Sequence, residues 1–571
     1  MKKILYIILA SLLLVTACDS TSTSSLLDGD FLPADTSPPS NQYPDNGQVI
    51  IDFNNDEDDP ELNDVLDMRL SWTAKSGADR YTLEVFSDRA MTEPVPGSPF
   101  SVSASDNFTN VVLPAAGVYW WRVRVSAPDS GQYSEPTSFD AREDCLYVYF
   151  PYDPDHPAAR PDDTGRTGNI DSPFQSINRA ITDADRYGIS TIKVATRGRL
   201  NPYDPLSDFA AYTEHFMFLP GIVLKGGYRY LAPEGSAPSM ERADGFPDSL
   251  EDNPYETRLE GKYDTISIKN IFAPTTIEGF AIRTGKSMAL DIQYCGRDLI
   301  VRDCILSSSY ASEGAAGLYI NFSDVQIIHN NISTADSANN SRFTGVEIRQ
   351  GEPVLINNMI MPGNVSSSSG SPHSYGVMNA GNPILVGNLI IAGNVTGDTS
   401  QSFSCGILND TDSSPILVNN TIIGGDADSD GGMSSSYGMY NNSIPGLVTN
   451  NIFLSMDTDS GDTRYGVFGT GLSDDNYYYN CIYVDGVTDY SGITLNSDSV
   501  TVDPLLDAEH RPTASSPSAV QTGGIIDPFS KADITVLDAY LSDILGAART
   551  PAYVENSADT GWSMGAYEYT E

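Results

Sequence analysis

Acidic side chains recur at short, regular spacing in the second half of the chain, where they could bind a hard cation. Residues 426–431 read Asp-Ala-Asp-Ser-Asp-Gly, a D-x-D-x-D-G loop. This spacing lets three carboxylates converge on one divalent ion, and the glycine permits the tight turn. The twelfth position of the loop is Tyr437, so the loop is not an EF-hand. We expect Ca²⁺ as the only cofactor, with ligands from this loop and the next acidic one: Asp426, Asp428, Asp430, Asp457, Asp459 and Asp462.

The two acidic loops occupy equivalent places in a repeat. Asp426 and Asp457 each lie six residues after a recurring asparagine, as do Asn364 and Asn394. Repeats stacked at the spacing of β-strands would bring these positions about 5 Å apart. Neighbouring carboxylates would repel each other there unless they shared a cation. The alternative is a solvated acidic loop in which Asn and Asp serve only as turn residues.

Aromatic side chains form a second candidate site. They belong to a column of residues, each two positions after a recurring glycine: Tyr319, Glu347, Met378, Leu408, Tyr440, Phe468 and Thr494. Strand alternation points this column away from the core. Its aromatic members, Tyr319, Tyr440 and Phe468, could form a platform for sugar or peptide. The alternative is that the long loops of the repeat cover them.

The elements that would position these residues are short strands in a repeat of about thirty residues, which begins near residue 275. One column consists of glycines, each followed by an apolar residue: Gly317-Leu318, Gly345-Val346, Gly376-Val377, Gly406-Ile407, Gly438-Met439, Gly466-Val467 and Gly492-Ile493. A second column has a polar pivot between two apolar triplets: Asp303, Asn331, Asn358, Asn388, Asn420, Asn451 and Asn480. Both columns share one period, and the segments lack the 3.6-residue periodicity of helical repeats.

The recurring asparagine has a physical role in such a stack, because its amide tolerates a left-handed turn and can bond to neighbouring backbones. Upstream, Phe174, Ile177, Ile181 and Ala184 fall on one face of a predicted helix near residues 172–184, suited to closing the end of a solenoid. Together these features resemble the right-handed parallel β-helix of the pectate-lyase-like superfamily, with its asparagine ladder of Asn331, Asn358, Asn388, Asn420, Asn451 and Asn480. The resemblance implies a β-helix over residues 145–502 and a closing segment over 503–571.

The resemblance does not fix an activity, because this fold hosts lyases, hydrolases, esterases, adhesins and inert stalks. A lyase needs cations around a uronate, yet residues 350–463 contain ten Asp or Glu and no Lys or Arg. The polygalacturonase-type pattern, paired adjacent aspartates with a nearby His-Gly and Arg-Ile-Lys, is also missing. A polysaccharide lyase or glycoside hydrolase would therefore have to use the earlier coils, with this charged set: Arg283, Lys286, Arg297, Arg302, Glu313, Arg342, Glu347 and Arg349. Scattered surface charge is the alternative explanation for the set.

Cysteines offer little chemistry in this repeat. Cys304 and Cys481 fall in one inward column six coils apart, too far to bond to each other. Cys295 and Cys304 either pair or remain buried thiols.

Residues 49–143 show short alternating strands of a different kind. Tyr81, Leu83 and Val85 share one face of a strand, and residues 119–125 read Tyr-Trp-Trp-Arg-Val-Arg-Val. With Trp72 on an earlier strand and Tyr133 before the last, the segment resembles a fibronectin type III-like β-sandwich. The predicted fold class is therefore all-β, with this small sandwich ahead of the parallel β-helix. Such modules are usually spacers or binding modules.

The N-terminus resembles a bacterial lipoprotein signal. A positive start precedes an apolar run, and Val15-Thr16-Ala17 then gives small residues before Cys18. The resemblance implies removal of residues 1–17 and lipidation of Cys18, with residues 18–48 as a flexible tether rich in Ser, Thr, Pro and Asp. The expected location is the cell envelope, with the outer membrane or cell surface ahead of the inner membrane.

The net charge of the chain limits the classes of molecule that it can bind. The chain has 571 residues and a formal net charge of −44. Nucleic acid is excluded because phosphate binding needs clustered Lys and Arg. We expect a monomer anchored to a membrane through Cys18, without a catalytic constellation, whose β-helix acts in adhesion, glycan binding or surface structure. Its partner would be a glycan or a protein on a host or cell surface.

Replacing Cys18 by Ser tests the anchor. The variant should lose its lipid and leave the membrane fraction, because no thioether can form on a serine. Detergent phase partitioning of the native and variant proteins measures this, with Cys304→Ser as the matched thiol control. Retention of the Cys18→Ser protein in the detergent phase would refute the anchor.

Overall fold

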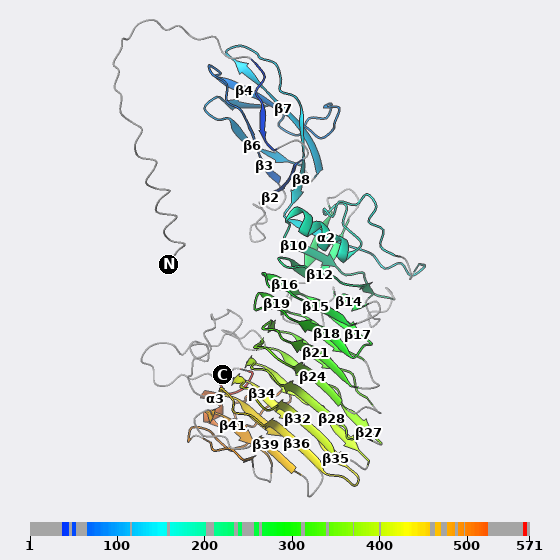
Figure 1. The fold of residues 1–571 in the computed structure, drawn as a ribbon, viewed down its shortest axis with the longest axis vertical. Helices are drawn as coiled ribbons and strands as arrows, with labels where there is room; N and C mark the ends of the chain where they lie inside the picture. The colour runs from blue at the N-terminus through cyan, green and yellow to red at the C-terminus, as the bar shows by residue number, and fades with distance from the viewer. Residues whose placement is uncertain are drawn as a thin grey trace, which may run out of the picture. The chain divides into compact units, whose positions relative to one another are not determined.

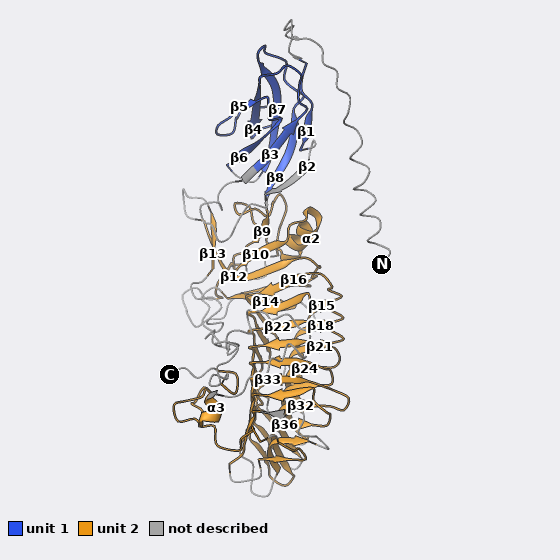
Figure 2. Ribbon diagram, turned by 90° about the vertical axis from the view of Figure 1, so that its left-hand side faces the viewer, with its two compact units in different colours: residues 1–142 blue, residues 143–571 orange. Residues whose placement is uncertain are grey.

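The computed structural model describes two compact units, residues 1–142 and 143–571, which are coloured separately in Figure 2. The residues described are 37–44, 48–52, 66–114, 117–156, 160–200, 210–232, 238–242, 256–261, 265–309, 314–337, 342–368, 370–398, 401–456, 463–469, 477–485, 489–495, 497–522 and 563–567. The signal segment and most of the tether lie outside them. No helix in the described residues is long and apolar enough to cross a membrane.

The first unit contains two sheets around one core. The three-stranded sheet has the order β1 (Asn41–Tyr43), β3 (Leu66–Trp72), β6 (Phe108–Leu113). The five-stranded sheet has the order β2 (Gln48–Asp52), β8 (Thr137–Glu143), β7 (Gly117–Ala127), β4 (Arg80–Phe86), β5 (Phe100–Ser103). Trp72 and Tyr81 come from different sheets and meet edge to face with ring centroids 5.3 Å apart. Trp121 lies in the same core, as the alternation of its strand predicts.

The second unit is a parallel β-helix of about 8 turns (Figure 1). In the described residues, its twelve-stranded sheet contains β9 (Cys145–Val148), β10 (Thr191–Ala195), β12 (Val223–Leu231), β13 (Ser239–Arg242), β16 (Thr275–Glu278), β19 (Leu299–Arg302), β22 (Gln326–Ile328), β25 (Val354–Ile356), β29 (Ile384–Val386), β33 (Ile416–Val418), β37 (Leu447–Thr449) and β40 (Tyr477–Tyr478). Among the described residues, neighbouring strands of this sheet pair in parallel, except that β13 pairs with β12 in the antiparallel sense.

The ten-stranded sheet contains β11 (Ala211–Glu214), β14 (Thr257–Gly261), β17 (Phe280–Thr284), β20 (Ile305–Ser308), β23 (Asn331–Thr334), β26 (Met359–Met361), β30 (Leu389–Ile391), β34 (Thr421–Gly424), β38 (Ile452–Ser455) and β41 (Cys481–Tyr483). The nine-stranded sheet contains β15 (Ile266–Lys269), β18 (Met288–Gln293), β21 (Ala315–Asn321), β24 (Arg342–Ile348), β28 (His373–Asn379), β32 (Ser402–Asn409), β36 (Ser434–Asn441), β39 (Thr463–Gly469) and β42 (Tyr490–Ser491). A short sheet adds β27 (Val365–Ser367), β31 (Val395–Gly397) and β35 (Ala427–Ser429).

The glycine column lies on the nine-stranded sheet, where neighbouring coils approach closely. A Cβ built on Gly376 would lie 2.4 Å from Cγ2 of Ile390 and 2.5 Å from the carbonyl oxygen of Gly406, so no larger residue fits. The apolar residues that follow the glycines are in register and fully buried: Leu318, Val346, Val377, Ile407, Met439 and Val467. The prediction was wrong at Gly492-Ile493, because Val467 pairs with Tyr490 instead.

A buried asparagine ladder joins six coils between the twelve-stranded and ten-stranded sheets. At each step, the backbone N–H and the side-chain Nδ2 of one asparagine both donate to Oδ1 of the next, at 2.9–3.1 Å. Each Nδ2 also donates to a backbone carbonyl of the preceding coil. The ladder therefore couples three successive coils at every rung. Its members are Asn330, Asn358, Asn388, Asn420, Asn451 and Asn480.

The prediction was wrong at the ladder's first member, because Asn330 occupies the rung and Asn331 lies one residue beyond it. Asn331 is the first residue of β23 and pairs in register with Met359. The position before each rung takes the left-handed conformation, as at Asn357 (φ 53°) and Asn419 (φ 53°). The left-handed turn and the ladder hydrogen bonds therefore belong to two adjacent residues, although one asparagine was predicted to provide both.

Helix α2 (Ile177–Tyr187) begins five residues later than predicted. Ser176 is the N-cap, its side chain accepting from the backbone N–H of Arg179, and Gly188 ends the helix at φ 74°. The apolar face of α2 packs against β9, β10 and β11 at the first coils. It therefore covers the N-terminal end of the β-helix core.

The chain's final described segment, 563–567, packs on the side of the late coils. The backbone N–H of Gly565 donates to the carbonyl of Asn450 at 2.8 Å, and Asn419 Nδ2 donates to the carbonyl of Ser563 at 2.7 Å. The short helix α3 (Ser518–Thr522) contributes Val520, which packs with Met564 against the same coils.

The cysteines of the β-helix are buried thiols. Cys295 and Cys304 do not pair, so the second of the two alternatives holds. Burial raises the pKa of the Cys304 thiol to about 12. This thiol therefore stays protonated and acts as a small apolar side chain.

Adjacent asparagines provide a matched test of the ladder. Replacing Asn330 by Ala removes the acceptor for the Cys304 backbone N–H and the amide donors to Val301, Ile328 and Asn358. We expect a loss of about 2–4 kcal/mol in the free energy of unfolding, because buried polar groups lose their partners. Asn331→Ala, outside the ladder, should cost less than about 1 kcal/mol. Urea denaturation measures both, and equal losses would contradict the assignment.

Candidate functional site

The outward column predicted from the sequence lies on the nine-stranded sheet. Pairing brings Ser267, Asp291, Tyr319, Glu347, Met378, Leu408, Tyr440 and Phe468 into one row across successive strands. Met378, Leu408, Tyr440 and Phe468 are partly exposed, whereas the residue before each of them is fully buried. The row therefore points out of the core, as alternation requires. It does not extend to Thr494, because Phe468 pairs with Ser491.

The last four coils of this row belong to an aromatic patch. We define the aromatic patch as His373, Tyr375, Met378, Phe403, Leu408, Tyr437, Tyr440, Tyr465 and Phe468. Tyr440 and Phe468 stack with centroids 5.0 Å apart and an interplanar angle of 21°. Tyr437 meets Tyr440 edge to face at 5.1 Å and stacks on Tyr465 at 6.3 Å. The rings hold one another in place and present a fixed apolar surface.

About half of this patch was not predicted from the sequence. A second column, against which the outward row packs, runs through the residue before each glycine: the buried Tyr375, Cys405 and Tyr437, and the half-buried Tyr465. The signal was present as Tyr-Gly at residues 375–376, 437–438 and 465–466. Burial raises the pKa of Tyr437 to about 12, so this phenol carries no charge at neutral pH.

Tyr319, the third predicted platform residue, lies outside the aromatic patch. Its neighbours in the row are Asp291 and Glu347. Glu347 is buried and forms ion pairs with Arg349 at 2.5 Å and Arg342 at 3.4 Å. Burial and the Glu347 carboxylate raise the pKa of the Tyr319 phenol.

Asp291 is held by neighbouring side chains in a similar way. It accepts from Ser267 Oγ at 3.0 Å and from Gln293 Nε2 at 2.8 Å, and Lys269 Nζ lies 3.9 Å away. This polar half of the face therefore has two buried carboxylates, each neutralised by a neighbouring cation. Asp291 and Glu347 lie two strand spacings apart along the column, or about 10 Å at the usual spacing.

The charged set predicted for the early coils does not assemble into one groove. Arg342, Arg349 and Glu347 meet on the nine-stranded sheet, but Arg283 pairs with Glu256 at 3.1 Å and Arg297 pairs with Glu352 at 3.4 Å. Lys286 is exposed, and Glu313 lies outside the described residues.

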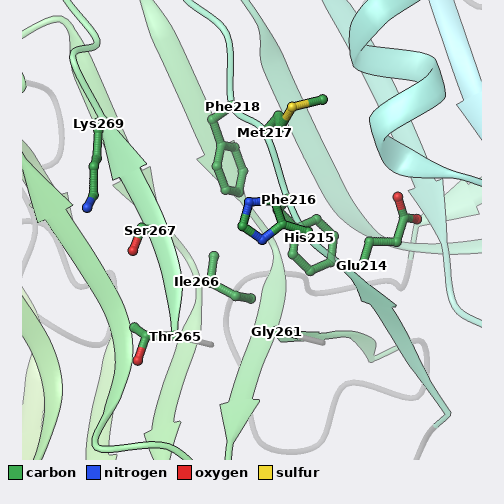
Figure 3. A pocket seen from close by; sticks show the side chains of 10 residues that line it. All are labelled: Glu214, His215, Phe216, Met217, Phe218, Gly261, Thr265, Ile266, Ser267 and Lys269. Atoms are coloured by element: carbon green, nitrogen blue, oxygen red, sulfur yellow. The ribbon is translucent and has the colours of Figure 1, made fainter. Parts of the chain in front are cut away.

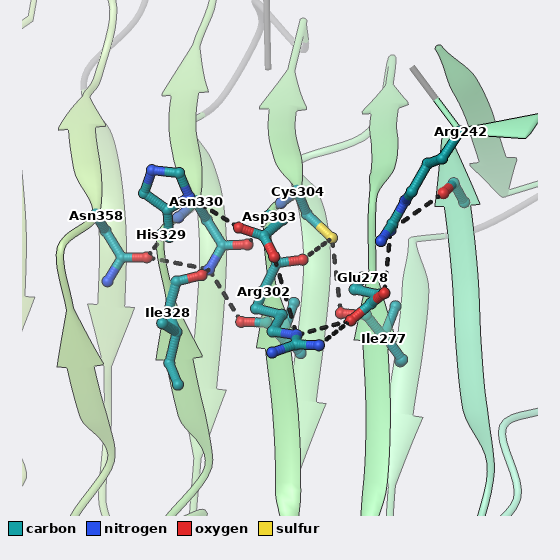
Figure 4. A network of polar contacts seen from close by, with 12 residues as sticks. Arg242, Ile277, Glu278, Arg302, Asp303, Cys304, Ile328, His329, Asn330 and Asn358 are labelled. Atoms are coloured by element: carbon teal, nitrogen blue, oxygen red, sulfur yellow. Dashed lines mark hydrogen bonds and ion pairs between the residues drawn. The ribbon is translucent and has the colours of Figure 1, made fainter. Parts of the chain in front are cut away.

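Arg302 belongs to a separate network on the twelve-stranded sheet (Figure 4). It bonds with Glu278, which also pairs with Arg242 at 3.0 Å and is 1% exposed. Beside it, Asp303 contacts Nδ1 of His329 at 2.8 Å. This network adjoins the first rung of the ladder and leaves no uncompensated charge on Glu278.

A pocket of about 440 Å³ lies at the first strand of the nine-stranded sheet (Figure 3). Thr265, Ser267 and Lys269 of the β15 region line one side, and the segment Glu214–Phe218 lines the other. Because Ser267 and Lys269 both contact Asp291, the pocket adjoins the outward row.

Of the predicted calcium residues, Asp426, Asp428 and Asp430 are described, and Asp426 takes part in a hydrogen-bonded series through its backbone N–H. Asp426 lies in a second hydrogen-bonded series, in which the side-chain oxygens of Asp336, Asn364 and Asn394 each accept the backbone N–H of the next coil's equivalent residue, at 2.7–2.9 Å. Asp428 and Asp430 are exposed. Asp457, Asp459 and Asp462 lie outside the described residues. Within the part that the structure describes, no three His, Cys, Asp or Glu side chains are grouped to hold a metal.

Two exposed aromatic residues were not foreseen. Tyr294 and Phe322 stack at 5.3 Å with nearly parallel rings, and they are 47% and 52% exposed. Both have positive φ, 56° and 49°, a conformation uncommon for large side chains. They lie directly after β18 and β21, beside the polar half of the nine-stranded sheet.

Comparisons with known proteins assign neither a family nor a function to the chain. No protein-family model matches the chain, and no curated protein matches it. Among solved structures, a family 28 exopolygalacturonase of Yersinia enterocolitica aligns at 11% identity, covering 77% of this chain and 98% of that one, with a TM-score of 0.19. The catalytic domain of a GH87 α-1,3-glucanase in complex with nigerose aligns at 12% identity, covering 76% and 91%, with a TM-score of 0.16. Similarity at this level does not assign a function.

Calorimetric titration of the full chain with CaCl₂ tests the calcium prediction. Binding through the acidic loops predicts heat that disappears in Asp428→Asn/Asp459→Asn, while the matched variant Asp410→Asn/Asp412→Asn keeps it. No heat from the native chain, or equal heat from both variants, would reject the site. In that case Asp426 would act only as a member of its hydrogen-bonded series.

Proposed function

We propose that the protein is a lipid-anchored envelope protein whose β-helix binds a neutral glycan along the outer face of the nine-stranded sheet. The aromatic patch supports this proposal most directly. Sugar rings have apolar faces that stack on aromatic side chains and hydroxyl edges that need donors and acceptors. The aromatic patch offers rings for stacking. The polar half of the same face, from Asp291 to Arg349, offers hydrogen-bond donors and acceptors.

Charge favours a neutral glycan over an acidic one. The coils that carry most of the patch lie within residues 350–463, which contain no Lys or Arg. A uronate there would find no Lys or Arg within those coils, and the chain's net charge of −44 would repel a polyanion. The cations that flank the patch are Arg342, whose Nη1 lies 3.9 Å from Met378 Sδ, and Arg464. Arg342 and Arg349 are already engaged with Glu347.

The rest of the chain fits an envelope location. Cys18 would carry the lipid, residues 18–48 would form the tether, and the fibronectin type III-like sandwich of residues 49–143 would act as a spacer. The antiparallel sheets of the first unit and their shared core support the sandwich part of this proposal. An anchored spacer would hold the binding face away from the lipid surface.

Hydrolysis of a polysaccharide is the second candidate function. It is favoured by Asp291 and Glu347, two buried carboxylates on one outward row of the early coils. A separation of about 10 Å is near the range of about 6.5–9.5 Å for enzymes that invert the anomeric centre. The ion pairs to Arg342 and Arg349 fit binding better than catalysis, because they occupy Glu347.

Binding to a panel of polysaccharides tests the proposal. The full chain should bind at least one neutral polymer among xylan, mannan, β-glucan and starch, should bind polygalacturonate more weakly, and should release no sugar. Tyr440→Ala/Phe468→Ala should weaken binding about tenfold, since aromatic contacts contribute about 0.5–1.5 kcal/mol each. Met433→Ala/Ile444→Ala, which removes exposed apolar groups outside the patch, is the control.

Two results would contradict the proposal. Equal binding by both double variants would exclude the aromatic patch as the binding surface. Release of reducing ends that stops in Asp291→Asn or Glu347→Gln would favour the second candidate.

A further inference from the structure

The pocket lies beside β15, at one end of the nine-stranded sheet. β15 is the first strand of that sheet, and the segment Glu214–Phe218 faces it across the pocket (Figure 3). Helix α2 fixes this segment, because Asn178 Nδ2 donates to the carbonyl of His215 at 2.8 Å and Asn178 Oδ1 accepts from the N–H of Met217 at 3.0 Å. A ligand lying along the outward row therefore meets a fixed wall here.

The charged groups around the pocket are matched within the protein. The Glu214 carboxylate accepts from Ser176 Oγ and the backbone N–H groups of Ile177 and Asn178, at 2.8–3.2 Å. It therefore balances the N-terminus of α2. Lys269 lies 3.9 Å from Asp291, which also accepts from Ser267. The pocket consequently suits a ligand without charge.

The pocket's two sides differ in polarity. Phe216 and Phe218 stack at 6.3 Å on one side, with the exposed His215 beside them, and β15 presents the Ser267 hydroxyl and the Lys269 ammonium on the other. An apolar wall opposite hydrogen-bonding groups matches the two aspects of a sugar ring. The volume of about 440 Å³ is within the usual range of about 300–1,000 Å³ for small-molecule sites.

We infer that this pocket binds a terminal unit of the neutral glycan whose chain lies along the outward row. The inference rests on the proposed function and adds that the protein recognises a chain end rather than the middle of a polymer. The row from Ser267 through Asp291 and Tyr319 to the aromatic patch provides the continuous path between the pocket and the rest of the binding face.

Stoichiometry on long chains tests end recognition without any variant. The probe is the neutral polysaccharide that binds best in the panel, prepared at two chain lengths, together with its hexaose. End recognition predicts one protein per chain at both lengths, measured by light scattering and calorimetry. A number of bound proteins that rises with chain length would overturn the inference while leaving glycan binding intact.

A pair of variants locates the site. His215→Ala/Phe218→Ala should weaken hexaose binding about tenfold, while Met433→Ala/Ile444→Ala, which removes exposed apolar groups outside the pocket and the aromatic patch, should not change it. Equal affinities for the native chain and the pocket variant would overturn the inference. Absence of any neutral-glycan binding by the native chain would instead refute the proposed function, so the two failures are distinguishable.

Discussion

The buried asparagine ladder is the interaction on which the rest of the β-helix depends. Its amides bond to one another and to backbone carbonyls inside the core, where unsatisfied polar groups would be costly. Because each rung touches the coils before and after it, a coil cannot shift by one residue without breaking bonds on both sides. The ladder thus fixes the register of the strands. That register in turn places Tyr440 against Phe468, so the aromatic part of the outward face depends on an interaction within the core.

Much of the architecture could be predicted because two periodic signals agree. The glycine column marks places where backbones approach too closely for a Cβ, and the asparagine column marks the ladder, so the fold follows from sterics and buried hydrogen bonding. The errors occurred where those constraints weaken. Asn331 was taken for Asn330 because both are asparagines and the coil before them carries Cys304 at the rung. The predicted pairing failed at Gly492-Ile493, because Val467 pairs with Tyr490, three residues before Ile493.

The candidate site was only partly predictable for a related reason. Alternation identifies which residues face outward, but it does not say which of them touch. Tyr319 and Tyr440 share a row, yet three strands lie between theirs, and only Tyr440 lies in the aromatic patch. The stacked acidic and amide positions that suggested a cation ladder form a series of side-chain to backbone hydrogen bonds through Asn394. The pocket could not be foreseen, because Glu214–Phe218 and β15 meet only through the fold.

The outer face of the nine-stranded sheet is the surface that we propose binds glycan. Hydroxyl-radical footprinting of the full chain, with and without the best-binding neutral hexaose, tests this claim residue by residue. We expect reduced oxidation of Met378, Tyr440 and Phe468 on the aromatic patch and of Met217 at the pocket, with no change at the exposed Met433. Unchanged oxidation of the patch in the presence of bound hexaose, with protection on another face, would contradict it.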